Sequence, residues 1–358
     1  MRSLDVLSNF RQPSVSVTIV TFNSAAFIER CLESVFRQTW QPLDIIVVDN
    51  ASSDNTRNLL VRYADRARVF FNVDNTGFCS GQNQAIAASK GDWVLTLNPD
   101  ADLESEFIEH LVAAAAQDPA VGTVCGKLIS LRKDPENPFA VFLDSTGIYF
   151  TPQMRHFDRG WHEPDDGRYG RIEYVFGASA AAAMYSRKMI DDISGNDGFF
   201  DPDFFAYRED ADVAWRAQLL GWRCLYTPYA IGHHVRSVVP GSRKSVPALL
   251  NMHSVKNRFL MRTKNMTSGL FRQYWSDMLG RDLLILGGCV VLERKSLTAY
   301  WRFVKCFRKA ILKRREIMRR KRVPEDYLVN WFTAGVEGRE SNQHPSPHEA
   351  IYYYKPTL

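Results

Sequence analysis

The chain has 358 residues, of which 45% are hydrophobic and 24% are charged. This length allows a large buried core, and the composition is that of a globular protein and excludes a disordered or fibrous one. The net charge of +5 is unevenly distributed, because residues 294–322 hold thirteen Lys or Arg and one acid, leaving 32 bases and 39 acids elsewhere. The sequence therefore predicts a mildly acidic body with one strongly basic segment.

Neither the cysteines nor the apolar runs indicate an extracellular or membrane-spanning protein. Six cysteines are scattered without Cys-x-x-Cys spacing, so we expect reduced core residues of a cytosolic protein and neither a zinc nor an iron–sulfur site. Residues 1–12 lack an apolar core long enough for a signal peptide. The longest uncharged apolar run, Leu283 to Leu292, is too short to cross a bilayer.

The N-terminal part alternates strand-like and helix-like segments. A first strand over Val15 to Thr21 ends in Phe22-Asn23-Ser24, and residues 25–38 then carry apolar side chains at helical spacing. A second strand over Asp44 to Val48 ends in Asp49-Asn50-Ala51-Ser52 and precedes another helical pattern. Short buried strands that alternate with helices predict a mostly parallel sheet with helices on both faces.

A third strand, Val94 to Leu97, runs directly into Asn98-Pro99-Asp100-Ala101-Asp102. Side chains two residues apart in extended backbone point to the same side, and two hard oxygen ligands can hold Mg²⁺ or Mn²⁺ while leaving positions for phosphate oxygens. The alternative is an Asp-rich turn that caps a helix starting near Leu103. Ligands of such sheets bind beyond the carboxyl ends of the strands, where all three polar clusters stand.

A second acidic group, Glu209, Asp210 and Asp212, opens a predicted helix inside the segment 199–216. A carboxylate at a helix N-terminus is favoured by the helix dipole and stays ionised. An ionised carboxylate can take the proton of an attacking hydroxyl as a general base. The alternative is that the three carboxylates only cap the helix.

These segments resemble family 2 glycosyltransferases of the GT-A fold, and most closely the bacterial rhamnosyltransferase-like branch of that family. The likeness covers roughly residues 13–237 and rests on five motifs as well as their order and spacing. The motifs are Val17-Thr18-Ile19-Val20-Thr21-Phe22-Asn23, the segment 46–54 with Asp49-Asn50-Ala51-Ser52, Asn75-Thr76-Gly77-Phe78 with Gly81 and Asn83, Asn98-Pro99-Asp100-Ala101-Asp102, and the segment 199–216 with Glu209-Asp210-Ala211-Asp212, followed by Gly221-Trp222. The resemblance implies a Rossmann-like GT-A domain, which the chain follows with a C-terminal helical extension.

The resemblance also implies an inverting, metal-dependent transfer, with Asp210 as the base and Glu209 orienting the site. Asp102 and Asp100, with one of His233 and His234, would bind Mn²⁺ or Mg²⁺; we favour His234 because Val-Arg-Ser follows it. The alternative for the histidines is a hydrogen-bonded pair without metal. The expected donor-binding residues are Thr21, Asn23, Asp49, Asn50, Ser52, Gly77, Asn83, Asn98 and Asp100.

The implied reaction moves a hexose, such as rhamnose, from a nucleotide-diphosphate sugar to a glycan or lipid-linked acceptor in cell-envelope polysaccharide synthesis. A dTDP-, UDP- or GDP-linked donor stays open. The alternatives are a nucleotidyltransferase or a nucleotide-sugar-binding protein without transfer activity. The first would place a Gly-rich loop with Lys or Arg after the first strand, where Thr21-Phe22-Asn23-Ser24 stands.

The basic segment 294–322 has aromatic and aliphatic residues such as Trp301, Val304 and Phe307 at helical steps, with bases on other faces. This pattern predicts a helix lying on an anionic membrane surface, so we expect a cytoplasmic protein attached peripherally to the inner face of the plasma membrane. The alternatives are a helix docked on the catalytic domain and a nucleic-acid-binding arm; we expect no nucleic acid. The predicted divisions are an arm (1–12), a GT-A catalytic domain (13–240), a basic amphipathic helical region (241–335) and a tail (336–358).

Overall fold

The computed structural model describes residues 12–132, 140–236 and 248–337. The predicted N-terminal arm and C-terminal tail therefore fall almost entirely outside the described residues, as does Ser237 after the two histidines. The predicted boundary at residues 240 and 241 also lies outside them and stays a prediction.

A large mixed sheet forms the centre of the molecule, with the strand order β10-β12-β6-β11-β4-β1-β2-β3. Two short strands extend it, because β5 pairs with β12 and β7 with β6, and β8 and β9 form a separate hairpin. The strands are β1 (Val15–Thr21), β2 (Leu43–Asp49), β3 (Arg68–Phe71), β4 (Trp93–Leu97), β5 (Ala101–Leu103), β6 (Val121–Ser130), β7 (Leu143–Ser145), β8 (Ile148–Phe150), β9 (His156–Asp158), β10 (Glu173–Val175), β11 (Ala182–Ser186) and β12 (Arg223–His234). Along the main path only β10 and β11 run against the other strands, so the predicted mostly parallel sheet is confirmed.

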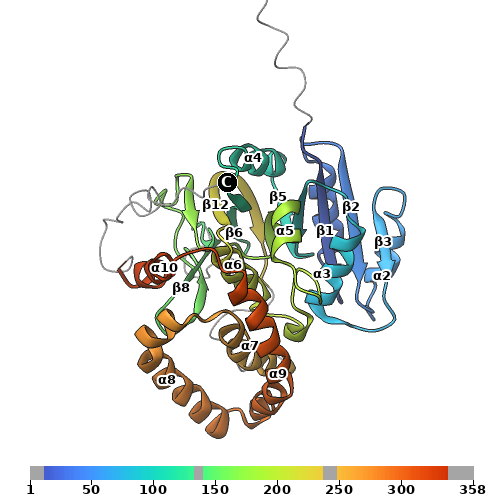
Figure 1. The fold of residues 1–358 in the computed structure, drawn as a ribbon. Helices are drawn as coiled ribbons and strands as arrows, with labels where there is room; N and C mark the ends of the chain where they lie inside the picture. The colour runs from blue at the N-terminus through green and yellow to red at the C-terminus, as the bar shows by residue number, and fades with distance from the viewer. Residues whose placement is uncertain (1–11, 133–139, 237–247, 338–358) are drawn as a thin grey trace, which may run out of the picture.

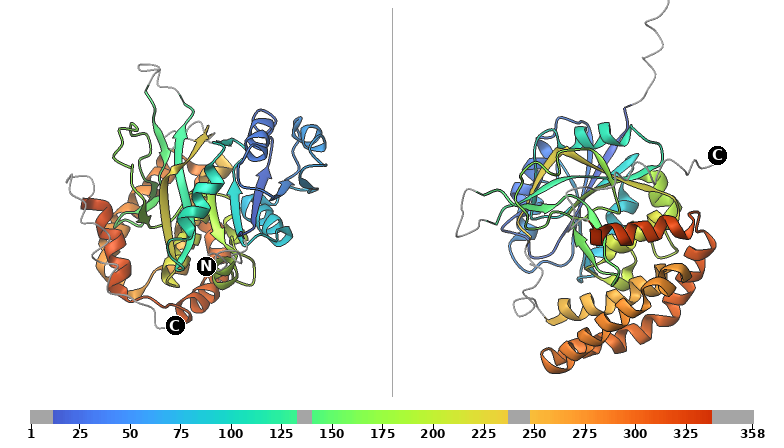
Figure 2. Two further views of the ribbon diagram at one scale, coloured as in Figure 1. Left: turned by 90° about the horizontal axis from the view of Figure 1, so that it is seen from above. Right: turned by 90° about the vertical axis from the view of Figure 1, so that its left-hand side faces the viewer.

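Helices cover both faces of this sheet, and each face has its own apolar core (Figure 2). One core contains side chains of α1 (Ile28–Phe36), α2 (Thr56–Val61) and α4 (Phe107–Ala115). The other contains side chains of α3 (Gly77–Ala88), α5 (Arg187–Ile193) and α6 (Glu209–Leu219). Every residue of β1 is buried, as expected for a strand covered on both sides.

The C-terminal helices pack into the second core. They are α7 (Ala248–Asn265), α8 (Ser268–Val291), the 3-10 turn η3 (Arg294–Leu297), α9 (Thr298–Arg319) and α10 (Glu325–Glu337). Phe332 of α10 lies 5.1 Å from Trp215 and 5.3 Å from Phe150, measured between ring centroids. Figure 1 shows α7, α8 and α9 gathered below the sheet and α10 crossing back toward β8. None of the helices in the described part of the chain is long and apolar enough to span a bilayer.

One local expectation was wrong. No helix starts near Leu103, because residues 101–103 form β5 against β12 and α4 begins only at Phe107. His233 and His234 end β12, which extends to residue 234 and pairs there with β5. Strand β5 thus gains backbone hydrogen bonds from a strand more than 120 residues away, a long-range pairing that local pattern does not report.

Candidate active site

The carboxyl ends of β1 and β2 form one side of the candidate site. Thr21 and Asp49 are register neighbours, and Thr21 Oγ1 donates to Asp49 Oδ2 over 3.0 Å. Asp49 is fully buried, and it also accepts from Arg57 Nε at 2.7 Å and from Ser52 at both the hydroxyl and the amide. Its carboxylate therefore fixes the loop after β2 through four donors within the protein.

Asn23 shapes the neighbouring loop from an exposed position. Its φ of 52° is left-handed, a conformation that Asn tolerates better than most residues. Its side-chain Oδ1 accepts from the backbone amide of Ser53 at 2.8 Å, and its backbone amide donates to Ser52 Oγ at 2.9 Å. The loops after β1 and β2 are thus tied to each other at the edge of the sheet.

Three other predicted donor-binding residues hold loops together. Asn50 Nδ2 donates to the carbonyl of Gly77 at 2.9 Å, and Asn83 Nδ2 donates to the carbonyl of Phe200 at 2.7 Å. Gly77 has a φ of +84°, and a Cβ there would meet the Phe205 ring at 2.5 Å. Only glycine lets the loop before α6 approach so closely.

Two of the predicted metal-binding residues, Asp100 and His234, have side chains in contact, whereas the side chains of Asp102 and His233 have other partners. His234 Nε2 lies 3.2 Å from Asp100 Oδ1, while its Nδ1 lies 2.8 Å from Asp144 Oδ2. Burial alone would lower the pKa of His234, but its hydrogen bonds to Asp100 and Asp144 raise it to about 9. In a metal-binding histidine, one ring nitrogen usually hydrogen-bonds a carboxylate that orients the ring, and the other faces the metal site.

Asp102 does not join that pair. It is the register partner of His233 in β12, and its carboxylate accepts from Arg30 Nε of α1 at 2.8 Å. His233 Nε2 in turn lies 2.8 Å from Glu104 Oε1. The expectation that Asp100 and Asp102 act from one face of an extended strand is not met, because Asp100 lies in the turn before β5. Asn98 precedes that turn, and its carbonyl accepts the amide of Ala101 at 3.1 Å.

Arg236 connects the His234 pair to the second acidic group. It forms ion pairs with Asp144 at 2.6 Å and with Asp158 of β9 at 2.7 Å. Asp158 and Arg236 both act electrostatically on Asp210, the first raising and the second lowering its pKa. Asp100, His234 and Asp210 are therefore linked through one network, although they are far apart in sequence.

Both carboxylates at the start of α6 are harder to ionise than usual. Burial is the main cause for Asp210, whose pKa is raised, and the charge of Asp158 adds to it. Burial and the charge of Asp210 raise the pKa of Glu209 further, and Glu209 Oε2 has no hydrogen-bond partner among the described residues. Asp210 keeps partial exposure, whereas Glu209 is buried. We expected the helix dipole to keep both carboxylates ionised, but their burial acts in the opposite direction.

The loop before α6 is held in an unfavourable conformation by α7. Phe205, Tyr207 and Arg208 all have positive φ between 68° and 70°, which costs free energy for residues other than glycine. Asn257 of α7 compensates, because its Nδ2 lies within 2.9 Å of the carbonyls of residues 204, 206 and 207. The C-terminal helices thus help to place Asp210.

Asp212 serves the same contact between α6 and α7. Its carboxylate pairs with Arg216 at 2.9 Å and with Lys264 of α7 at 2.9 Å, and it accepts from Asn265 at 2.8 Å. Burial opposes ionisation of Asp212, but the charges of Lys264 and Arg216 bring its pKa below the ordinary value. Asp212 is therefore an ionised structural residue.

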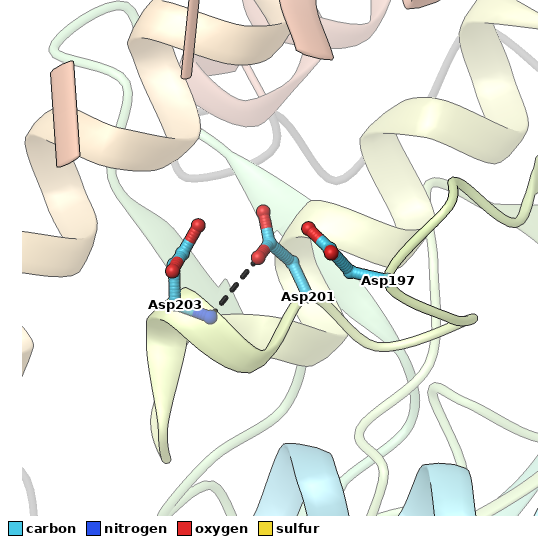
Figure 3. A group of neighbouring side chains, drawn as sticks. All are labelled: Asp197, Asp201 and Asp203. Carbon is cyan, nitrogen blue, oxygen red and sulfur yellow. Dashed lines mark hydrogen bonds between the residues drawn. The ribbon is translucent and has the colours of Figure 1, made fainter. Parts of the chain in front are cut away.

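Three carboxylates near α6, those of Asp197, Asp201 and Asp203, lie close enough together to hold a cation (Figure 3). Lys313 of α9 already supplies that positive charge, since its Nζ lies within 2.8 Å of all three residues. The group therefore binds α9 to the catalytic part of the chain.

This docking changes the interpretation of the basic segment. Lys309 and Lys313 meet that carboxylate group, and Arg320 and Arg322 pair with Asp192. Trp301, Val304 and Phe307 are exposed instead of facing the body of the protein. Part of the basic face is thus turned inward, as the docked alternative predicts.

Comparison with known proteins identifies the family. The model of the family described as glycosyl transferase family 2 matches residues 16–212, more than half of the 358 residues. The chain belongs to glycosyl transferase family 2. The predicted family is confirmed, and so is its likeness to rhamnosyltransferases.

Among curated relatives, this family 2 glycosyltransferase is 27% identical over 244 residues to the N-acetylglucosaminyl-diphospho-decaprenol L-rhamnosyltransferase of Mycobacterium tuberculosis. That match covers 61% of this chain and 75% of the relative. The poly-beta-1,6-N-acetyl-D-glucosamine synthase of Staphylococcus aureus is 23% identical over 220 residues, which are 61% of this chain but 48% of that protein.

A solved structure of GalNAc-T7 with UDP, GalNAc and Mn²⁺ resembles the fold of this glycosyltransferase with a TM-score of 0.57 at 14% identity. The match covers 84% of this chain and 57% of that one. It confirms the predicted GT-A fold class.

Two residues of the candidate site, Asp144 and Asp158, were not found from the sequence. Both lie in the region after β6 that has no readable periodicity, on the short strands β7 and β9. An isolated Asp on a three-residue strand gives no signal in one sequence. Arg236 was visible beside His234, but its role depends on those two carboxylates.

Proposed function

We propose that this glycosyltransferase moves a hexose, with inversion at the anomeric carbon, from a nucleotide-diphosphate sugar to a glycan or lipid-linked acceptor. The observation that carries the proposal is the network in which Arg236 joins the Asp100–His234 pair to the surroundings of Asp210. Such a network would bring a cation site for a diphosphate and a carboxylate for an acceptor hydroxyl into one site. These are the two parts that a direct displacement on the sugar requires.

Asp100 and His234 are the proposed ligands of a divalent cation, Mn²⁺ or Mg²⁺. Their donor set fits such an ion, because a carboxylate oxygen and an imidazole nitrogen 3.2 Å apart leave room for phosphate oxygens and water. Asp144 would hold the His234 ring in orientation. A bound cation would supply Lewis-acid neutralisation of the departing nucleoside diphosphate. The Mn²⁺ in the GalNAc-T7 structure supports this proposal.

The donor nucleotide is proposed to lie over the ends of β1 and β2. Asn23 is exposed there, while Thr21, Asp49 and Ser52 fix the loop beneath it. Asn50, Gly77, Asn83 and Asn98 would act on the donor by holding the surrounding loops.

Asp210 is the proposed general base. It is partly exposed and its pKa is raised, which brings the proton affinity of its carboxylate closer to that needed at neutral pH. Glu209 is buried with a pKa raised further, so it would stay protonated and orient the site without taking the acceptor proton.

A lipid-linked acceptor in cell-envelope synthesis is supported by the printed name of the mycobacterial relative, which acts on a diphospho-decaprenol. Membrane-surface attachment is supported by exposed apolar residues at the end of α8, namely Leu283, Leu284, Leu286, Val290, Val291 and Leu292. Exposed bases lie nearby in sequence at Arg302, Lys305 and Arg308. We propose that α8 and α9 contact the bilayer together.

Incubation of the protein and Mn²⁺ with dTDP-rhamnose, UDP-hexoses and GDP-sugars, with and without an N-acetylglucosaminyl-diphospho-polyprenol, tests the proposal. We expect nucleotide release that depends on acceptor, together with a glycosylated lipid. A nucleotidyltransferase would instead need added pyrophosphate, and would then convert the nucleotide sugar to a nucleoside triphosphate and a sugar phosphate. A binding protein would release nothing.

A further inference from the structure

An apolar concavity lies outside the catalytic network, between α7, α8 and α9. It has a volume of about 730 Å³. Its apolar wall is formed by Phe259 of α7, Phe271, Trp275, Met278 and Leu279 of α8, and Ile311 of α9. Phe271 and Trp275 are 56% and 53% exposed, so the groove is open to solvent. An open groove lined by aromatic and aliphatic side chains fits an apolar chain.

The wall on the α7 side is cationic. Arg262 lines the groove, and Arg258 lies one helical turn earlier with a side chain only 3% exposed. Both compete for one acid, because Asp282 is 3.1 Å from Arg258 Nε and 2.6 Å from Arg262 Nη2. Two further buried nitrogens, Arg262 Nη1 and Arg281 Nε, have no hydrogen-bond partner among the described residues.

Positive charge is concentrated around Arg258. Burial is the main reason why the pKa of Arg258 falls to about 9, and the charges of Arg262, Arg208 and Arg281 lower it further, while the charge of Asp282 raises it. Buried cations without enough counter-charge are costly unless an anion accompanies them. Arg guanidinium groups bind phosphate oxygens in bidentate geometry, so a phosphate group suits this wall.

The same arginines lead toward the proposed general base. Arg258 Nη2 donates to the carbonyl of Gln153, in the turn between β8 and β9. Arg208, whose charge acts on Arg258, donates to the carbonyl of Ser254 at 3.0 Å and directly precedes Glu209 and Asp210. The arginines therefore lie between the loop that carries Asp210 and the apolar groove.

We propose that this groove holds the first isoprene units of a lipid-linked acceptor, and that Arg262, backed by Arg258 and Arg281, binds the diphosphate that joins the lipid to its sugar. The inference deepens the proposed function and rests on it for the identity of the acceptor. Charge complementarity and the apolar lining select an isoprenyl diphosphate over a peptide or a second copy of the chain. The sugar at the head of such an acceptor would then extend toward Asp210.

Calorimetric titration with farnesyl diphosphate, inorganic pyrophosphate and farnesol tests the groove directly. Donor is omitted and a chelator is present, so that no metal can bind a diphosphate at the Asp100–His234 pair. We expect farnesyl diphosphate to bind at least about tenfold more tightly than either half-molecule. Affinity no better than that of pyrophosphate would overturn the proposal.

Matched variants locate the binding. Arg262→Gln and Trp275→Ser should each weaken farnesyl diphosphate about tenfold. Arg272→Gln and Leu312→Ser should bind like the wild type, because these exposed residues do not line the groove. Leu279→Ser, half exposed, gives a second groove variant if Trp275→Ser melts early. Wild-type affinity in the groove variants, or equal weakening in the controls, would contradict the assignment.

The outcome is separate from that of the proposed function. Farnesyl diphosphate binding with the expected variant pattern, but no sugar transfer to any lipid acceptor, would refute the transfer reaction and keep the groove. Transfer to a lipid acceptor that is unaffected by Arg262→Gln and Trp275→Ser would keep the function and refute the groove.

Discussion

Asp100 and His234 come within 3.2 Å of each other although 134 residues separate them in the chain. Strand β12 brings His234 back to the turn that follows β4, and Asp144 holds the far side of its ring. The neighbouring carboxylate, Asp102, is instead bound to Arg30. Asp100 and Asp102 therefore have different partners in the structure, although they look equivalent in the sequence.

Replacement of the two aspartates should therefore have unequal effects. Asp100→Asn removes the anionic oxygen that faces His234 and should abolish most of the Mn²⁺-dependent part of donor binding. Asp102→Asn removes a partner of Arg30 and should leave that part nearly unchanged. Titration of nucleotide sugar with and without Mn²⁺ measures both. The ligand assignment fails if Asp102→Asn loses the metal effect and Asp100→Asn keeps it.

Stability should depend on pH through Glu209. Its pKa is raised in the folded protein above the ordinary 4.5, so the folded state holds this proton more tightly than the unfolded state does. This contribution to stability is complete at pH values below the ordinary pKa and is lost as pH rises through the folded value. Glu209→Gln should therefore melt at a higher temperature than wild type in alkaline buffer, with a difference that shrinks toward about pH 5. A difference that does not vary with pH would exclude a raised pKa.

Lys264 should be important for the stability of the fold. Its side chain is 2% exposed and lies between Asp201 at 2.6 Å and Asp212 at 2.9 Å. Lys264→Met leaves buried carboxylates without their counter-charge and should lower the free energy of unfolding by about 3–5 kcal/mol. Lys309→Met, at a site 47% exposed, should cost less than about 1 kcal/mol. If urea unfolding shows that Lys264→Met and Lys309→Met lose the same free energy of unfolding, burial does not make the Lys264 ion pairs more important for stability.

Binding to anionic vesicles should depend on α8 and α9 in different ways. The triple change Arg302→Gln, Lys305→Gln and Arg308→Gln removes three bases worth about 1 kcal/mol each at an anionic surface, and should weaken co-sedimentation mainly at low salt. Leu284→Ser with Val291→Ser should reduce the part that survives high salt, because it removes apolar contact. Unchanged sedimentation of both variants would leave these helices as packing or partner-binding surfaces.

The α/β class and the strand ends could be predicted from sequence because they follow from local pattern. The apolar run Ile45 to Val48 of β2, followed directly by polar residues, reads the same in the sequence as in the structure. The pairing of Asp100 with His234 could not be predicted from local pattern and was suggested only by the family resemblance, because it depends on the register of β5 against β12. Asp144 and Asp158 stand on strands of three residues, which are too short to show a period.

The C-terminal helices illustrate the same limit. Most of the basic segment 294–322 forms the helix α9, as the spacing indicates, but its partners come from segments around residues 192–203. Helical periodicity locates a charged face and does not say whether that face meets water, lipid or other acids. Asn257 is a similar case, since its contacts with the strained loop 204–207 follow only from tertiary packing.

We propose that Asp210 takes the proton of the acceptor hydroxyl. Asp210→Asn keeps the size of the side chain and removes its basicity, so turnover should fall at least about a hundredfold while donor affinity stays near that of the wild type. Glu209→Gln is the matched control and should lose much less, since burial and the charge of Asp210 raise the pKa of Glu209 and make it a poor proton acceptor for an exposed hydroxyl. The decisive measurement is sugar transfer by Asp210→Asn at saturating donor and acceptor, alongside its donor affinity. Loss of transfer with intact donor binding is the predicted result, and wild-type turnover in Asp210→Asn would contradict the account.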